Sequence, residues 1–463
     1  MTRQLSKTKI ESEQNSMSIQ KPLNILIAVH HFPPTFKGGA EWRAHRTAKW
    51  MQQQGHTVRV ICVDAVNDLD TEQLRYEDQT FDDIPVRRLF LNLQNAPEPT
   101  KWEYENPWIG DHLNQYLKAN KPDLVHLISG YLMTAAAIKQ FKTYKLPIVA
   151  TLTDFWFLCP HHTLQRTSGE LCPENTPLDC ARCHFEQQRR FRLPAQKIPR
   201  LSNVLWHGGQ HIPQVNAYTE QIKQRQETLQ ATLSQIDIAI SPSKFLRDTY
   251  LRKGYQAKQM LFMRQGLKHI PATPPEKTTS DILRIGYIGG IAPHKGVQVL
   301  VEAFLKLQTD KAELKLYGDT SKFAEFTEKL KEESADTPQL KFMGTFDNQQ
   351  ISEIHANLDV LVVPSIWYEN SPNVILESFA HRTPVITSNL GGMAELVQDD
   401  HTGLLFKPNN AVDLAQKLAF ILDTPSKLTT WQQNLKPLKS LEAEMNELAQ
   451  IYNIVLHAPK SRR

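Results

Sequence analysis

Short apolar runs alternate with helical stretches along this chain, and the alternation predicts a parallel β-sheet. The first run, LNILIAV, has the length of a strand. A loop with two glycines follows it, then a helix expected from about Glu41 to Gln54 and a second strand, HTVRVICVD. Later runs such as DLVHLIS and PIVATLTD continue the alternation. We therefore expect a doubly wound sheet with helices on both faces.

The opening pattern recurs after residue 281, which predicts a second domain. ILRIGYIGG reads as a strand, IAPHKG as a loop, VQVLVEAFLKLQ as a helix and AELKLYG as a strand. Proline and polar residues fill the preceding stretch, as is typical of a linker. The predicted parts are a disordered lead-in (1–20), an N-terminal domain (21–267), the linker (268–281), a C-terminal domain (282–430), and a C-terminal helix with a basic tail (431–463).

Composition indicates an ordinary globular protein. Of 463 residues, 40% are hydrophobic, and 53 basic against 49 acidic residues leave a net charge of +4, too small an excess to suggest a dedicated nucleic-acid binder. We find no uninterrupted apolar run long enough to span a membrane and no apolar core of a secretory signal. We expect a cytoplasmic location, where five cysteines are reduced or bind metal.

Two carboxylates, Glu369 and Glu377, have seven residues between them in WYENSPNVILE. Ser371 suits the N-cap of a helix and Pro372 its first position, so the amides that follow would face an anion. A loop glutamate and a solvated helix face fit the same spacing. Two glycine loops, FKGGAE with Gly38 and Gly39 and GGIAPHKG with Lys295, could cradle phosphate, although each could also be a simple turn.

Several motifs in order resemble the retaining nucleotide-sugar glycosyltransferases of family four. They are HHFPPTFKGGAE, GYIGGIAPHKGVQVLVEAF, FMGTFDNQQISEIHANLDVLVVPS and WYENSPNVILESFAHRTPVITSNLGGMAELVQDDHTGLLF. The resemblance implies the GT-B architecture, two facing Rossmann-like domains with a C-terminal helix that crosses back to the N-terminal domain.

The resemblance also implies roles for site residues. Glu369 would face the transferred sugar as a catalytic residue, and Glu377 would bond the ribose. Lys295 would neutralise the diphosphate, while Gly38 and Gly39 would face the donor phosphate and the acceptor. The remaining implied donor contacts are Asn370, Ser371, Pro372 and Asn373 on sugar and phosphate, and Gly318 and Gly344 near the base.

The chain departs from the family pattern at two positions. Gly290 stands where many relatives carry an arginine, and Arg264 is a candidate substitute for that cation. Thr153 stands where many relatives carry a histidine that touches the donor sugar. We expect His126 or Asp154 to compensate as a catalytic residue.

The implied activity is transfer of a sugar from a UDP- or GDP-type donor to a glycan or lipid-linked acceptor, as in polysaccharide or cell-envelope glycan biosynthesis. Same-face attack would let the acceptor hydroxyl give its proton to the departing phosphate, and no divalent metal is required. A non-catalytic sugar-nucleotide-binding or scaffold protein is the alternative. A zinc-module nucleic-acid binder would leave the second half of the chain unexplained.

Two features lie outside these motifs. Cys159, Cys172, Cys180 and Cys183 cluster in a loop over residues 159–184, where they could bind a structural zinc, form a redox pair or pack as plain thiols. The adjacent run FEQQRRFRLPAQKIPR could touch anionic membrane lipid or an anionic acceptor, or be a solvated helix face.

Overall fold

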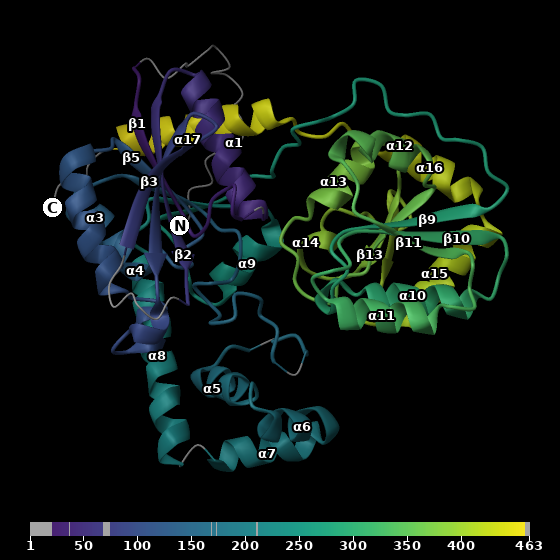
Figure 1. Ribbon diagram of the computed structural model, residues 1–463, viewed down its shortest axis with the longest axis horizontal. Helices are drawn as coiled ribbons and strands as arrows, with labels where there is room; N and C mark the ends of the chain where they lie inside the picture. The colour runs from purple at the N-terminus through teal and green to yellow at the C-terminus, as the bar shows by residue number, and fades with distance from the viewer. Residues whose placement is uncertain are drawn as a thin grey trace, which may run out of the picture.

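Two α/β domains and a helical lobe make up the protein (Figure 1). The computed structural model describes residues 21–36, 38–67, 75–167, 169–172, 174–209 and 212–458. The predicted lead-in over residues 1–20 and the basic tail lie outside these residues. Within the described ranges, no helix combines the length and the apolar character needed to cross a bilayer.

The N-terminal sheet has the order β3-β4-β2-β1-β5-β6-β7-β8. Its strands are β1 (Asn24–Val29), β2 (Thr57–Ala65), β3 (Arg75–Phe81), β4 (Ile84–Leu91), β5 (Leu124–Ile128), β6 (Ile148–Thr151), β7 (Ile238–Ser241) and β8 (Gln259–Phe262). Neighbouring strands run parallel, except that β3 and β4 form an antiparallel hairpin. Strands β5, β6 and β7 are buried on both faces, which is why they read as continuous apolar runs.

Helices cover both faces of this sheet (Figure 1). They are α1 (Gly39–Gln53), α2 (Pro99–Trp102), α3 (Pro107–Asn120), α4 (Thr134–Thr143), α8 (Pro213–Leu233) and α9 (Lys244–Arg252). Between β6 and α8 the chain forms the lobe, which consists of α5 (Pro177–Phe185), α6 (Arg189–Lys197) and α7 (Pro199–Gly209). The lobe projects away from the sheet, at the lower end of the view in Figure 1.

The C-terminal sheet is parallel throughout, with the order β11-β10-β9-β12-β13-β14. Its strands are β9 (Leu283–Ile288), β10 (Ala312–Tyr317), β11 (Leu340–Gly344), β12 (Val360–Val363), β13 (Val385–Ser388) and β14 (Gly403–Phe406). Its helices are α10 (Val297–Leu307), α11 (Ala324–Glu333), α12 (Ile351–Ala356), α13 (Asn373–Ala380), α14 (Gly391–Ala394), α15 (Ala411–Asp423) and α16 (Ser426–Asn434).

The last helix, α17 (Leu441–His457), crosses back to the N-terminal domain (Figure 1). Met445, Leu448 and Tyr452 on this helix are buried in the same core as Ile25 and Ile27 of β1. The predicted fold, two facing Rossmann-like domains with a returning C-terminal helix, is therefore confirmed.

Candidate functional site

A cavity of about 410 Å³ lies in the cleft between the two domains. Residues that follow β6 line one side of it, and residues that follow β9 and β12 line the other. The beginnings of α1 and α13 also face it. These are the carboxyl ends of parallel strands, where doubly wound sheets bind their ligands. The predicted site residues that line the cavity are Gly39, Asp154, Gly290, Lys295, Glu369, Asn370, Ser371, Pro372 and Asn373.

Glu369 lies in the loop after β12, where one oxygen of its carboxylate accepts three hydrogen bonds. Lys295 Nζ donates to Oε1 over 2.6 Å, Trp367 Nε1 over 2.9 Å and Ser365 Oγ over 3.1 Å. Burial raises the pKa of Glu369, but the charge of Lys295 and these hydrogen bonds outweigh it and hold the pKa below its ordinary value. Glu369 is therefore an anion at neutral pH. Its Oε2 accepts no hydrogen bond from the described residues, so this oxygen is available to a ligand.

The helix after Glu369 begins one residue later than predicted. Pro372 is the N-cap and Asn373 is the first helical residue. Ser371 makes no capping hydrogen bond to the helix. Its carbonyl accepts a hydrogen bond from Gln265 (2.7 Å) and its hydroxyl one from Arg264 (3.4 Å). In the part of the chain that the structure describes, the backbone N–H groups of Ser371 and Asn373 have no acceptor. Such free amides at a helix start suit an anion.

Two predicted donor-binding side chains bond to the opposite domain. Ser243 Oγ donates to Asn370 Oδ1 over 2.6 Å, and Gln265 Nε2 donates to Asn373 Oδ1. The segment after Glu369 therefore holds the two domains together as well as lining the cleft.

Arg264, the predicted substitute cation, does not line the cleft. Its guanidinium pairs with Glu395 over 3.1 Å and donates to the carbonyl of Pro242 over 3.2 Å, which fixes it in the contact between the domains. A contact between Arg264 and a diphosphate therefore stays a prediction. Arg46 of α1 lines the cleft instead, and it has no hydrogen bond or ion pair with any described residue.

The predicted glycines have different surroundings. Gly290 faces open space, since a Cβ built there meets no atom within 4 Å, whereas a Cβ on Gly318 would lie 1.8 Å from the carbonyl oxygen of Gly289. Gly318 N donates to the carbonyl of Gly344 over 2.8 Å. Gly318 thus brings the ends of β9, β10 and β11 close together. Gly38 is the N-cap of α1.

The two residues predicted to compensate for Thr153 differ in position. Asp154 lines the cleft, where its carboxylate accepts hydrogen bonds from Ser129 Oγ (2.7 Å) and the backbone amide of Trp156 (2.8 Å).

His126 does not reach the cleft. Its ring is buried between the hydroxyl groups of Tyr452 (2.7 Å) and Thr151 (2.8 Å). Burial lowers the pKa of His126 to about 3, so the ring is neutral. The prediction of a catalytic role is wrong, because β5 directs this side chain to the face of the sheet that α17 covers.

Glu377 lies on α13 and is not among the residues that line the cavity. Burial raises its pKa above the ordinary value, and the charge of Arg46 only partly opposes this effect. The pKa values of Glu369 and Glu377 thus move in opposite directions, which shows that the two carboxylates occupy different environments.

The cleft residues that sequence reasoning missed include Arg43, Arg46 and His162. The two arginines lie three positions apart just after the FKGGAE loop, a spacing that places both on one face of α1 and was a usable signal. His162 had no such signal, because it belongs to the cysteine-rich loop. That loop returns to the cleft through a hydrogen bond from Phe155 N to the His162 carbonyl (3.0 Å). Burial lowers the pKa of His162 to about 4.

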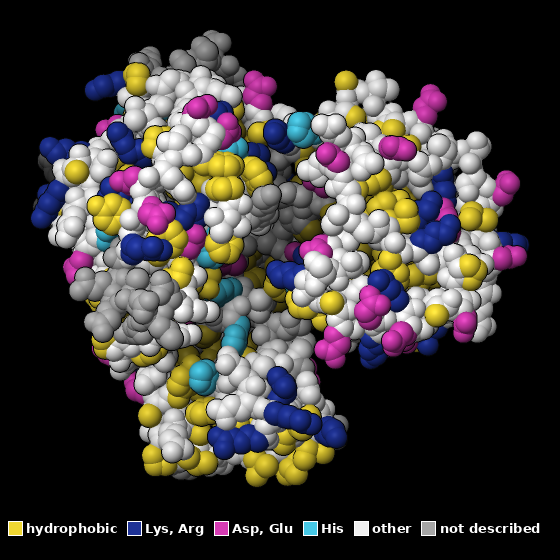
Figure 2. All heavy atoms as spheres, viewed as in Figure 1, with side chains coloured by type: hydrophobic (Ala, Val, Ile, Leu, Met, Phe, Trp, Pro, Cys, Tyr) yellow, Lys and Arg dark blue, Asp and Glu magenta, His cyan; other side chains and the backbone are white. Residues whose placement is uncertain are grey.

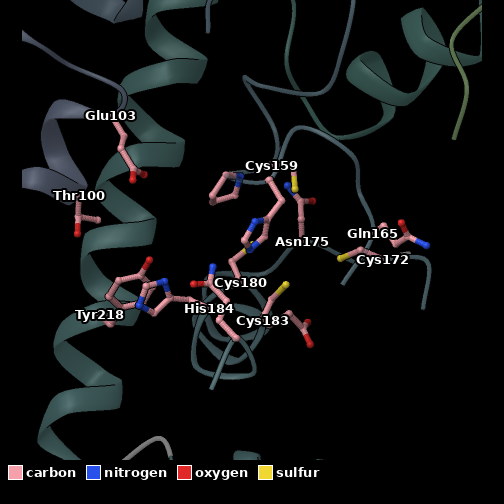
Figure 3. A pocket seen from close by; sticks show the side chains of 14 residues that line it. Thr100, Glu103, Cys159, Gln165, Cys172, Asn175, Cys180, Cys183, His184 and Tyr218 are labelled. Atoms are coloured by element: carbon pink, nitrogen blue, oxygen red, sulfur yellow. The ribbon is translucent and has the colours of Figure 1, made fainter. Parts of the chain in front are cut away.

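The four clustered cysteines line one cavity of about 220 Å³ between α5, α8 and the cysteine-rich loop (Figure 3). Within the described residues, no three His, Cys, Asp or Glu side chains are placed to hold one metal ion. Cys172 donates to the carbonyl of Glu174, and Cys183 pairs with the hydroxyl of Thr167, so these thiols turn to separate partners. The structure therefore does not support the predicted zinc site at Cys159, Cys172, Cys180 and Cys183. Burial raises the pKa of Cys172 to about 11.

Two family models together match most of the chain. The family model "Glycosyl transferase 4-like domain" matches residues 38–266, and "Glycosyl transferases group 1" matches residues 283–424. An uncharacterized glycosyltransferase from Methanocaldococcus jannaschii is 28% identical over 29% of this chain and 34% of its own length. Alpha-D-kanosaminyltransferase from Streptomyces kanamyceticus is 28% identical over 36% of this chain and 44% of its own length. The chain thus spans less than half of these two relatives.

Longer alignments have lower identity. An uncharacterized 42.6 kDa protein in the cps region of Klebsiella pneumoniae is 20% identical over 81% of this chain and 87% of its own length. Sucrose-phosphate synthase from Thermosynechococcus elongatus is a solved structure with a TM-score of 0.65 and 19% identity, covering 94% of this chain and all of its own. HepE from Anabaena, solved with UDP and glucose, has a TM-score of 0.60 and 16% identity, covering 93% and 99%. These structures show a shared fold.

Proposed function

We propose, from the premise that this chain belongs to the group 1 glycosyl transferases, that it transfers a sugar from a nucleotide-sugar donor to a hydroxyl group of an acceptor with retention at the anomeric carbon. The observation that carries the proposal is the cleft between the domains. There the anionic Glu369, the cations Lys295 and Arg46, and the start of α13 face one cavity.

The charges in this cleft suit a nucleoside diphosphate. Arg46 offers a guanidinium without a partner among the described residues, and the amides of Ser371 and Asn373 offer the positive end of a helix. Lys295 donates a hydrogen bond to Glu369 and orients that carboxylate. The same ammonium group would neutralise charge on the diphosphate. HepE, which shares the fold, was solved with UDP, and this supports a nucleotide donor of the UDP type.

Glu369 is suited to bind the transferred sugar rather than to protonate a leaving group. Its pKa is held low, and its free Oε2 can accept hydrogen bonds from sugar hydroxyls. Glu377, one turn after the start of α13, would reach the ribose. Gly318 and Gly344 would lie near the base. Asp154 and His162 would face the sugar from the N-terminal domain. They would take the place of the histidine that many relatives carry where this chain has Thr153.

The leaving diphosphate needs positive charge more than it needs an acid. Arg46, Lys295 and the helix amides stabilise the charge that develops on it, as preorganised donors do in other transfer reactions. The acceptor hydroxyl would attack from the face that the diphosphate leaves and pass its proton to the departing phosphate oxygen. This chemistry requires no divalent metal.

The acceptor class is a glycan or a lipid-linked sugar, in polysaccharide or cell-envelope glycan biosynthesis. The long alignment with a protein of a cps region supports this assignment.

A donor panel tests the proposal. The protein is incubated with UDP- and GDP-sugars, with and without glycan acceptors, and nucleotide release is measured. We expect release from one donor, at least a hundredfold slower in Glu369→Gln, while the exposed Glu302→Gln leaves the rate unchanged. NMR of the product should show the anomeric configuration of the donor. A protein that binds a donor but releases no nucleotide with any acceptor would instead be the non-catalytic alternative.

A further inference from the structure

The outer face of α7 in the lobe is apolar and uncovered. Leu201, Val204 and Leu205 are 54%, 69% and 63% exposed. They follow one another at helical spacing, so they share a face. Ile198 and Ile212, at the two ends of this helix, are about half exposed as well. Of the thirteen large hydrophobic side chains that are exposed in the described residues, six lie between residues 193 and 212, so they form a patch rather than a scatter.

The lobe does not need this face for its own core. Phe185, Phe191 and Trp206 pack against one another with ring centroids 5.8 to 6.0 Å apart. Ser202 and Ala195 are buried on the same inner side. The inner face of α7 therefore stabilises the lobe, and the outer face is available for another surface.

Basic side chains flank the apolar patch. Arg189, Arg190, Arg192 and Lys197 lie on α6, and none of them forms an ion pair within the described residues. The sequence holds no aspartate or glutamate from residue 187 to residue 219. Figure 2 shows the basic and hydrophobic side chains gathered together on the lobe, at the lower end of the molecule.

We propose that the lobe docks the protein on the surface of an anionic lipid bilayer. Aliphatic side chains beside free cations match the boundary between acyl chains and acidic headgroups, where an amphipathic helix lies in the plane of the membrane. The basic side chains beside the patch favour an anionic partner over a purely apolar one. A single-stranded nucleic acid would need exposed aromatic rings for stacking, whereas the exposed patch is aliphatic. The lobe projects from the domain, a position from which it can reach a flat surface (Figure 1).

Vesicle co-sedimentation tests the proposal with the full chain. Vesicles of pure phosphatidylcholine are compared with vesicles that contain 30% phosphatidylglycerol, at low and high salt. We expect binding to the anionic vesicles that weakens with salt. Changing Arg189, Arg190 and Arg192 to glutamine should weaken binding about a hundredfold, since each basic residue near such a surface contributes about a factor of five. The matched control changes Lys118, Lys121 and Lys145, which are exposed elsewhere, to glutamine and should bind nearly as the parent.

The apolar contribution is tested separately. Leu201→Glu with Leu205→Glu should abolish vesicle binding, whereas Val412→Glu, at a residue that is also 54% exposed but lies on α15, should not. Amide hydrogen exchange of the parent protein should slow over residues 189–212 when anionic vesicles are added. Absence of binding to anionic vesicles, or binding that the lobe variants leave intact, would overturn the proposal. A lobe variant that turns a dimer into a monomer without any vesicle binding would assign the patch to a second copy of this chain.

Discussion

Glu369 and Lys295 form the pair on which the chemistry of the cleft depends. The carboxylate is mostly buried, yet its pKa lies below the ordinary value because the Lys295 charge and the hydrogen bonds to the carboxylate offset the cost of burial. The lysine therefore determines the protonation state of the glutamate as well as supplying charge to a ligand.

Lys295→Met should remove this offset and let burial raise the pKa of Glu369. The acidic limb of the kcat/KM profile should then move to higher pH, since the carboxylate protonates earlier as the pH falls. At neutral pH we expect a loss of about a hundredfold or more. The measurement is nucleotide release from pH 4.5 to pH 9, with Lys322→Met, an exposed lysine of the same domain, as the control. An acidic limb that stays in place would show that another group governs it.

Glu377 presents the opposite case. Burial raises its pKa, so the folded state binds its proton more tightly than the unfolded state. Its ionisation then costs stability, a cost that is absent below the unfolded pKa and grows as the pH rises through the folded pKa. Glu377→Gln should therefore raise the Tm at pH 7 but not at pH 4. If Glu377 binds the ribose, the same variant should raise the donor KM about tenfold or more. If the Tm difference between Glu377→Gln and the parent is the same at pH 4 and pH 7, the first expectation is contradicted.

Gly290 and Gly318 offer a matched pair of substitutions. Gly290→Ala should leave stability nearly unchanged, because its Cβ meets nothing within 4 Å. Gly318→Ala should cost about 1–3 kcal/mol, because its Cβ would lie 1.8 Å from the Gly289 carbonyl. Urea unfolding of both variants measures the difference. Equal stabilities would mean that the loops after β9 and β10 move apart freely.

At the scale of the element, strands were predictable and the faces of buried strands were not. The runs DLVHLIS and ILRIGYIGG match β5 and β9 because buried parallel strands are continuously apolar. The same continuity removes the alternation that would tell which way His126 points. Arg264 is a similar case, since its partner Glu395 stands 131 residues further along the chain. Only the two arginines of α1 left a local signal, which is their spacing after the glycine loop.

Glu395 connects elements of the two domains at the contact between them. Its carboxylate follows α14 and accepts hydrogen bonds from the first backbone amides of α9, at Lys244 and Phe245, and from Arg264. The N-terminus of α9 in one domain is thus satisfied by a carboxylate from the other. This contact stabilises the arrangement of the two domains that the structure shows.

Glu395→Gln should loosen that arrangement, because it removes the charge that pairs with Arg264 and with the start of α9. We expect a larger radius of gyration by small-angle X-ray scattering and a several-fold higher donor KM, with a smaller difference from the parent at high salt. Glu302→Gln, which removes an exposed charge on α10, is the control. An unchanged radius together with an unchanged KM would show that the other contacts between the domains suffice.

At the scale of the whole molecule, α17 ties the two domains into one unit. Glu444 on this helix pairs with Arg43 of α1 over 2.6 Å and accepts a hydrogen bond from the Gly266 amide over 2.8 Å. Arg43 also donates to Gln265 over 2.8 Å, and both of these residues line the cleft. Helix α17 therefore holds in place the part of α1 that lines the cleft.

Glu444→Ala should destabilise the protein by about 3–5 kcal/mol, because it leaves Arg43 buried without its counter-charge. Changing both residues to methionine should restore most of this loss, since two apolar side chains of similar volume need no partner. Urea unfolding of Glu444→Ala, Glu444→Met, Arg43→Met and the double methionine variant completes the cycle. The double variant should still lose donor affinity, because the cleft then has one cation fewer. A double variant as unstable as Glu444→Ala would instead mean that the lost packing and the Gly266 hydrogen bond, rather than the unpaired charge, carry the cost.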